Sequence, residues 1–310
     1  MTERKQQQFS RRQFLATTSA VAACAGAIGP VVAADTAPPA PPQVELGRTG
    51  IKLSRVGQGT GMHGGNRQSD HTRMGFEKLV ALLRHAYECG ITFFDLADLY
   101  GTHIYMREAL RFFPRDKITI LSKLWWRYDG PTKPKAEAYR KKVARTTIER
   151  FLHEIATDHI DILLLHCATT STWQEELEPY MAAMDEAKKR GKLRAVGVSC
   201  HHIDALRVAA DSSWVDVILA RINPEGVKMD GTPEEVTAVL RRAKQNGKAV
   251  IGMKILGEGQ LADRKEKCIQ FAQRLGLLDA MTIGFEKPEE TDEILNLIGR
   301  YPPKPVVTGG

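Results

Sequence analysis

The spacing of hydrophobic and polar positions changes repeatedly along the chain from Val44 onward. Short apolar runs alternate with longer segments in which apolar residues recur every three or four positions, as on one face of a helix. Residues 76–87 contain one such face, and Gly90 ends that helix ahead of the apolar run at 91–94. Strands that alternate with helices in this way predict βα units and a parallel sheet.

Eight strands can be counted, and the order of helix, glycine and strand recurs at Gly191 and Gly247. The strands are expected to end near Gly59, Asp95, Lys123, His166, Ser199, Arg221, Met253 and Gly284. Eight repeated units favour a closed (β/α)8 barrel that folds as one domain. A doubly wound open sheet is the alternative, but no GxGxxG motif follows the first strand.

Helix starts support the same organisation. Thr172 with Glu175, and Thr232 with Glu235, have the spacing of capping boxes, and Pro233 suits a first helical turn. Each box is expected to open the helix that ends at Gly191 or at Gly247.

The segment 44–53 (VELGRTGIKL) precedes the first strand of the barrel. It has Arg48-Thr49-Gly50 between two short alternating runs, which predicts a β-hairpin. Such a hairpin can cover the amino-terminal opening of a barrel. The carboxyl-terminal mouth, where barrel enzymes carry their chemistry, then stays free.

The first 33 residues have the order of a targeting signal. Arg11 and Arg12 precede a mildly apolar run, and Val31-Val32-Ala33 has the small residues of a cleavage site. We therefore expect a twin-arginine (Tat) signal peptide at 1–33, an Ala/Pro-rich linker at 34–43 and the barrel at 44–310, with the Tat machinery as export partner and a periplasmic or extracytoplasmic location. In the alternative, residues 21–24 are a lipoprotein box and the lipidated Cys24 anchors the protein. No later apolar run approaches the roughly 20 residues that a membrane helix needs.

Charge and cysteine content exclude some classes of protein. Removing the four basic residues and one acidic residue of the leader lowers the formal net charge from +7 to +4, which does not indicate a nucleic-acid partner. The remaining cysteines are scattered and form no CxxC pair, so neither a disulfide framework nor a zinc knuckle is expected. They are Cys89, Cys167, Cys200 and Cys268.

Four polar residues follow the second, third and fourth strands: Asp95, Tyr100, Lys123 and His166. A phenol has a pKa near 10, and an ammonium within about 4 to 6 Å lowers that pKa. Lys123 is placed to supply that charge, and Asp95 to hold Lys123 in position. His166 is placed to donate a hydrogen bond to a substrate carbonyl. The four residues therefore predict proton transfer from Tyr100 to a carbonyl oxygen.

The segments FFDLADLYG, ILSKLW and DILLLH, which hold these residues, resemble the aldo-keto reductase family, whose catalytic tetrad is Asp, Tyr, Lys and His in this order. The resemblance extends over residues 46–60, 191–199, 250–261 and 283–290. It implies an enzyme that reduces a small aldehyde or ketone to an alcohol, or the reverse, with hydride from nicotinamide C4 and the proton from Tyr100. NADP(H) or NAD(H) is the implied cofactor, with no metal.

The same resemblance implies a set of cofactor contacts. Ser199 matches the serine that binds the nicotinamide carboxamide, whereas Cys200, Leu219 and Met253 stand where many relatives have asparagine, glutamine and a stacking tyrosine. Gly259 belongs to the loop expected around the pyrophosphate. The expected cofactor residues are Gly59, Thr60, Asp95, Ser199, Cys200, Met253, Lys254, Leu256, Gly257, Gly284, Glu286, Lys287 and Glu290.

The adenosine end of that set leaves the choice of nucleotide open. Many relatives hold the 2′-phosphate with an arginine where this chain has Glu286, followed by Lys287. A carboxylate suits a free ribose hydroxyl and repels a phosphate, while Lys287 can offset that repulsion. NAD(H) and NADP(H) are therefore both considered.

The substrate wall is expected to include Met62, Trp125 and Trp126, with at least one tryptophan in the pocket.

Two other functions compete with the reductase. A metal-dependent barrel hydrolase would use four histidines, but no HxH pair is present and the tetrad would have no role; these are His63, His166, His201 and His202. A non-catalytic cofactor-binding sensor would not need all four tetrad residues.

Overall fold

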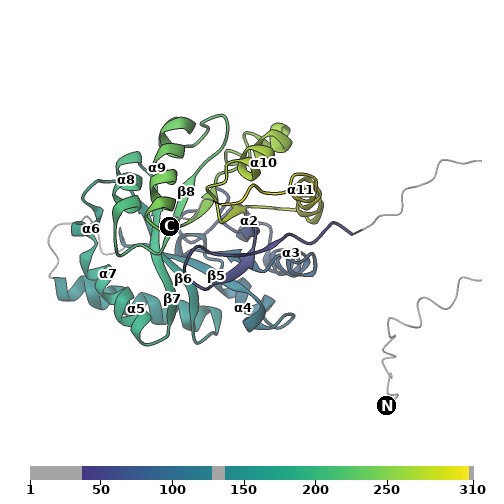
Figure 1. Ribbon diagram of the computed structural model, residues 1–310. Coiled ribbons are helices and arrows are strands. Elements are labelled where there is room, and N and C mark those ends of the chain that lie inside the picture. The colour runs from purple at the N-terminus through teal and green to yellow at the C-terminus, as the bar shows by residue number, and fades with distance from the viewer. Residues whose placement is uncertain (1–36, 128–136, 307–310) are drawn as a thin grey trace, which may run out of the picture. The chain divides into compact units, whose positions relative to one another are not determined.

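The computed structural model describes residues 37–127 and 137–306, and within them eight parallel strands form a closed barrel (Figure 1). The strands are β3 (Val56–Gly59), β4 (Phe93–Asp95), β5 (Thr119–Leu124), β6 (Ile160–Ala168), β7 (Leu193–Cys200), β8 (Val217–Arg221), β9 (Ala249–Met253) and β10 (Ala280–Ile283). They pair in chain order, and β10 returns to β3. The predicted (β/α)8 barrel is confirmed, and the open sheet is excluded.

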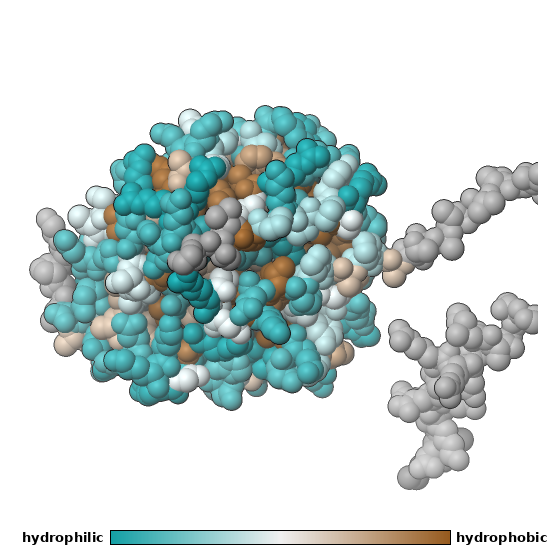
Figure 2. All heavy atoms as spheres, viewed as in Figure 1, coloured by the Kyte–Doolittle hydropathy of each residue, from teal (hydrophilic) through white to brown (hydrophobic). Residues whose placement is uncertain are grey.

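Helices follow the strands and surround them (Figure 1). The α-helices are α2 (Asp70–Arg73), α3 (Phe76–Glu88), α4 (His103–Ala109), α5 (Glu137–Ile155), α6 (Trp173–Glu176), α7 (Glu178–Lys189), α8 (Ile203–Asp211), α9 (Pro233–Gln245), α10 (Lys265–Arg274) and α11 (Pro288–Arg300). Short 3-10 helices are η1 (Asp98–Tyr100), η2 (Arg115–Lys117) and η4 (Ala262–Arg264). On the face seen in Figure 2, hydrophilic residues cover most of the surface and hydrophobic residues show as scattered patches.

Glycines end the helices where the sequence predicts. Gly90, Gly191 and Gly247 follow α3, α7 and α9 and have φ values of 89°, 74° and 75°, a conformation that side chains disfavour. At the start of α9, Thr232 and Glu235 form the predicted capping box.

The capping box predicted at Thr172 is wrong. The Thr172 hydroxyl makes no cap hydrogen bond and instead donates to Glu176 Oε1 at 2.6 Å. The helix that it opens, α6, has only four residues, and the separate helix α7 begins at Glu178 with Leu177 as its N-cap. The Thr172 hydroxyl is therefore engaged by the carboxylate of Glu176, one turn further along, and does not cap the helix as predicted.

The predicted hairpin is confirmed and closes one end of the barrel. It pairs β1 (Gln43–Glu45) with β2 (Lys52–Ser54) in antiparallel register. Leu46, Ile51 and Leu53 are fully buried in the cluster of apolar side chains that fills the barrel interior. A Cβ added at Gly47 would lie 2.9 Å from that of Ala249, the first residue of β9. The hairpin thus covers the amino-terminal opening and leaves the opposite mouth free.

The barrel closes where its last strand meets its first. β10 pairs with β3 in a register that places Met281 opposite Val56. Beside this seam the buried Arg55 donates to Gln273 Oε1 at 3.0 Å and to the carbonyl of Leu278, and burial lowers the pKa of Arg55 to about 10. On the outside, α3 and α11 lie side by side (Figure 1). Contacts between the two ends of the chain therefore complete the fold.

The expected leader at 1–33 lies outside the described residues, as does the start of the linker. Among the helices that the structure does describe, none combines the length and the apolar character needed to cross a membrane.

Candidate active site

A buried ion pair forms the inner part of the site. Lys123 on β5 and Asp95 on β4 are 1% and 6% exposed, and Lys123 Nζ donates to Asp95 Oδ1 and, at 3.1 Å, to the carbonyl oxygen of Leu96. Burial lowers the pKa of Lys123, and the Asp95 carboxylate opposes that shift. The predicted pairing of these two residues is confirmed.

Tyr100 ends η1, the short turn that follows β4. Its ring centroid lies 4.7 Å from Lys123 Nζ. Two glycines make room for the ring: a Cβ at Gly61 would lie 2.3 Å from Tyr100 Cζ, and one at Gly64 would lie 2.4 Å from Cδ1. These glycines were not predicted as site residues. The sequence GTGMHGG marks them as a flexible turn and gives no sign of the ring above them.

The expected direction of the Tyr100 pKa shift is wrong. Burial raises the pKa of Tyr100 well above its ordinary value, and the Asp95 carboxylate raises it further. Lys123 is close enough to act on the phenol, but burial and the Asp95 carboxylate outweigh its effect on the pKa. Tyr100 therefore keeps its proton at neutral pH.

A network below the turn holds Tyr100 in place. Asp98, whose side chain is fully buried, accepts hydrogen bonds from Arg67 Nη2 and Arg150 Nη2, both at 2.7 Å. Gly101 follows Tyr100 with φ 67°, and a Cβ there would lie 2.2 Å from the Arg67 carbonyl oxygen. Because Asp98 and Gly101 flank Tyr100, these contacts fix the phenol over the mouth. The sequence gives no signal for this network.

His166, near the end of β6, faces the tyrosine. Its ring lies edge-on to Tyr100 with centroids 5.6 Å apart, and edge-on to Trp125 at 5.8 Å. Burial lowers the pKa of His166 well below its ordinary value, with a further contribution from Lys123, so the imidazole is neutral. Its buried Nδ1 has no hydrogen-bond partner within the described residues.

The two tryptophans play different parts. Trp125 is partly exposed beside His166, whereas Trp126 is buried and donates from Nε1 to the carbonyl oxygen of His166 at 2.9 Å. Trp125 is thus the one at the mouth, and Trp126 packs behind it.

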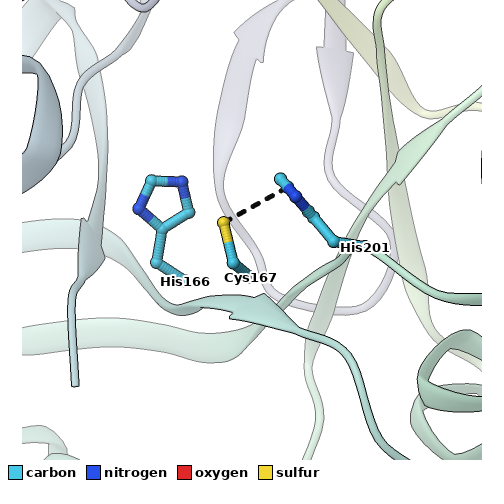
Figure 3. Close-up of side chains that lie close together, drawn as sticks. All are labelled: His166, Cys167 and His201. Atoms are coloured by element: carbon cyan, nitrogen blue, oxygen red, sulfur yellow. Dashed lines mark hydrogen bonds between the residues drawn. The ribbon is translucent and has the colours of Figure 1, made fainter. Parts of the chain in front are cut away.

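A polar chain that was not predicted from the sequence runs beside His166, and Figure 3 shows its first two members, Cys167 and His201. Cys167 has a left-handed backbone with φ 61°, and its Sγ lies 3.5 Å from His201 Nε2. Arg221 Nη2 bonds to His201 Nδ1, and Arg221 Nη1 donates to Asp230 at 3.1 Å. A guanidinium only donates, so His201 Nδ1 accepts, and its Nε2 carries a hydrogen toward Cys167.

Charge states along this chain follow from burial. Burial lowers the pKa of His201 to about 3, with Arg221 adding to the shift, and raises the pKa of Cys167 to about 11. His201 is therefore neutral and Cys167 is a thiol at neutral pH. The four histidines of the hydrolase alternative do not meet: His63 is exposed and bonds to Asp70 at 2.6 Å, and His202 caps α8.

A cleft of about 320 Å³ leads outward from Asp95 and Tyr100. The predicted residues that line it are Gly59, Met62, Asp95, Met253, Lys254, Leu256, Gly259, Gly284, Glu286 and Glu290. It also contains residues that were not predicted, among them Glu258, Lys265, Thr282 and Glu293. Lys254, expected to carry charge toward a pyrophosphate, forms an ion pair with Glu258.

Five predicted cofactor residues lie outside the lining of the cleft. Thr60 donates to the carbonyl oxygen of Asp95 at 2.8 Å, Gly257 has φ 56°, and Lys287 is the N-cap of α11. Ser199 is fully buried with an unpartnered hydroxyl, and Cys200 packs in the apolar layer between the strands and the helices.

The barrel, its closed amino-terminal end and the polar mouth opposite define a (β/α)8-barrel enzyme with its site at the carboxyl ends of the strands. The model of the Aldo/keto reductase family matches residues 55–298. The protein belongs to this family and is an oxidoreductase.

Individual relatives agree with the family. An NADH-specific methylglyoxal reductase of Escherichia coli is 26% identical over 197 residues, 58% of each chain. An L-galactose dehydrogenase of Arabidopsis thaliana is 28% identical over 228 residues, 71% of this chain and 66% of the relative. The chain thus spans less than two thirds of the length of either relative.

Solved structures share the fold. A thermostable aldo-keto reductase in complex with the inhibitor epalrestat has a TM-score of 0.64 at 24% identity, over 83% of this chain and 94% of the other. An aldo-keto reductase from Bacillus halodurans in its holo form has a TM-score of 0.61 at 18% identity, over 86% and 92%.

Proposed function

We propose that the protein reduces a small aldehyde or ketone to an alcohol, or catalyses the reverse, with NAD(P)H as the cofactor that the family implies. One observation carries the proposal: Tyr100, His166 and the Lys123–Asp95 pair meet at the inner end of the cleft. The bound nicotinamide would supply hydride from C4.

The residues at this end of the cleft fit a dinucleotide. The hydroxyl of Thr282, in the lining, and that of Ser199, outside it, are buried without a partner in the described part of the chain, which is unusual unless a ligand meets them. Thr282 lines the cleft, and a Cβ on Gly59 would lie 3.0 Å from its Oγ1. Small residues and free hydroxyls thus leave room and hydrogen-bond capacity for a flat polar ring.

Each tetrad residue has a distinct part in the reaction. Tyr100 holds the proton and passes it to the carbonyl oxygen as hydride reaches the carbonyl carbon. Neutral His166 donates a hydrogen bond to that oxygen and fixes its direction. Lys123, held in place by Asp95, brings an ammonium close to the phenol, which favours loss of the phenol proton as the carbonyl oxygen takes it up.

Nucleotide binding tests the proposal most directly. The nucleotide that copurifies with the full chain should be NAD(H) or NADP(H), and fluorescence titration should show saturable binding of at least one reduced form. A purified protein that binds neither NADH nor NADPH would contradict the proposed function.

The outer end of the cleft favours NADH. Glu286, Glu290 and Glu293 line it, and Lys265 is ion-paired with Glu293 at 2.6 Å. Burial raises the pKa of Glu286, and the nearby carboxylates of Asp70 and Glu290 raise it further, which shows how crowded with negative charge this end is. A 2′-phosphate placed here would meet repulsion, whereas a ribose hydroxyl can donate to a carboxylate.

Glu286→Arg should therefore raise the affinity for NADPH relative to NADH by about 10-fold to 100-fold, because a repelling carboxylate becomes a charge-assisted donor. Titration of both nucleotides measures the ratio. Glu289→Arg is the matched control, since Glu289 lies three residues further along, in the first turn of α11, is exposed and does not line the cleft. An unchanged ratio in Glu286→Arg would place the 2′ position elsewhere.

We also propose that the protein is exported through the Tat route, on the evidence of the leader sequence. Replacing Arg11 and Arg12 with lysine should leave the precursor in the cytoplasm and remove mature-length protein from the periplasm, as fractionation and immunoblotting would show. Cys24→Ser distinguishes signal cleavage from lipidation. The substitution should release the protein from the membrane only if the protein is anchored through a lipid on Cys24. Normal export of the double lysine variant would argue against the route.

A nicotinamide cofactor is made in the cytoplasm, so an exported barrel would leave carrying it and would need paired substrates to reduce and oxidise it in place. Parent protein from the periplasm should then retain nucleotide after extensive washing. Recovery of a fully apo protein with weak affinity for both dinucleotides would rule out this closed cycle.

A further inference from the structure

Two clusters of metal-ligating side chains occur among the described residues: His166 with Cys167 and His201, and His85 with Cys89 and Asp292. The first cluster is unsuited to a cation. His201 Nε2 carries a hydrogen, because Arg221 occupies Nδ1, and the guanidinium of Arg221 adds a positive charge beside the cluster.

The second cluster lies on the outside of the barrel, away from the tetrad. His85 lies in the last turn of α3, Cys89 is the C-cap of that helix, and Asp292 faces them from α11. His85 Nε2 lies 2.9 Å from Asp292 Oδ1 and 3.5 Å from Cys89 Sγ, and Cys89 Sγ lies 3.6 Å from Asp292 Oδ1. Three potential ligand atoms of three chemical types therefore form one compact triangle.

This triangle has the size of one face of a tetrahedral zinc site. Zinc binds nitrogen and oxygen at about 2.0 Å and thiolate sulfur at about 2.3 Å, so neighbouring ligands in a tetrahedron are separated by about 3.3 to 3.5 Å. The distances from Cys89 Sγ to His85 Nε2 and to Asp292 Oδ1 already match this separation. The distance from His85 Nε2 to Asp292 Oδ1, 2.9 Å, must increase slightly.

The surroundings also suit a cation. The side chains of His85 and Asp292 are 28% and 38% exposed, so a metal can enter and water can fill the fourth position. The Asp292 and Glu88 carboxylates both act on the Cys89 thiol, and Glu88 is itself paired with Arg84 at 2.8 Å. A thiolate and a carboxylate from the triangle would balance the two positive charges of the metal.

We propose that His85, Cys89 and Asp292 bind Zn²⁺, which ties α3 to α11 and thereby clamps the seam where the barrel closes. The site is independent of the proposed reductase function. A metal link between segments so far apart in the chain restricts the unfolded state and stabilises the folded one.

Zinc binding must displace the proton of the Cys89 thiol, because the thiolate is the ligand. One proton should therefore leave the thiol for each metal bound, and the affinity for zinc should fall as the pH is lowered.

The test uses the full chain after removal of metals with a chelator. Titration with Zn²⁺ against a chromogenic chelator should show one site, and zinc should raise the apparent Tm. Co²⁺ in its place should give the visible spectrum of a tetrahedral thiolate complex. Cys89→Ser should remove that spectrum, and Asp292→Asn should weaken zinc binding at least tenfold.

Two control variants make the outcome decisive. Cys167→Ser removes the thiol of the other cluster and should leave the cobalt spectrum intact, and His153→Ala changes an exposed helical histidine and should leave zinc affinity unchanged. A spectrum that survives Cys89→Ser but disappears with Cys167→Ser would overturn the proposal. So would a protein that binds no zinc at micromolar concentration.

Discussion

Tyr100→Phe should lower carbonyl reduction by about 100-fold to 10,000-fold, the range typical of a lost general acid, while nucleotide binding stays unchanged. Phenylalanine keeps the ring that packs over Gly61 and Gly64 and removes only the transferable proton. Turnover of a carbonyl substrate that the parent protein reduces gives the first quantity, and fluorescence titration of NADH gives the second.

Tyr105→Phe is the matched control, because Tyr105 stacks on Phe76 outside the mouth with centroids 4.9 Å apart. It should leave turnover unchanged. Near-normal turnover in Tyr100→Phe would mean that another group supplies the proton, and the proposed role of the whole tetrad would then fail.

Lys123→Met should lower turnover by a similar factor, because the phenol loses the nearby ammonium that favours release of its proton. It should also reduce the free energy of unfolding by about 3 to 5 kcal/mol, because it leaves the buried Asp95 carboxylate without its partner. Chemical denaturation measures the second effect. Adding Asp95→Asn removes the stranded charge, so the double variant should regain stability without regaining activity.

A second buried ion pair separates stability from chemistry. Lys244 Nζ bonds to both oxygens of Asp279, at 2.9 and 2.8 Å, with both side chains at most 5% exposed. Lys244→Met should therefore destabilise the fold to a similar degree but leave turnover per folded molecule intact. If Lys123→Met behaved like Lys244→Met, Lys123 would be structural only.

Strand ends were predictable because each strand is a buried apolar run followed by a polar residue or a glycine. Asp95, Lys123 and His166 could be found in this way, since their place at the mouth depends only on where strands end. The direction of the Tyr100 pKa shift could not be predicted from the sequence. It depends on how deeply the phenol is buried and on how close the Asp95 carboxylate lies to it, and both are properties of the packed structure.

Alternation along strands explains two further results. Successive side chains point to opposite faces, so Ser199 and Cys200 cannot both reach the mouth, and Cys200 packs under the helices. The same rule, applied from Val217 and Leu219 in the barrel interior, directs Arg221 toward the mouth. The position of Arg221 at the mouth could therefore have been predicted from the sequence. The acidic outer end of the cleft was harder to predict from the sequence, because Lys265 and Glu293 come from two different helices.

The pairing of β10 with β3 also determines when the barrel can close as the chain is synthesised. On the ribosome, β3 emerges before the other strands of the barrel and lacks one of its two neighbours until β10 has been synthesised, so the barrel cannot close before then. Late closure of this kind slows folding and exposes strand edges meanwhile. The lining of the cleft runs from Gly59, at the end of β3, to Ile294 on α11, and so a nucleotide can be captured only after α11 has been synthesised. For an exported protein, the nucleotide would have to bind after that point and before passage through the membrane.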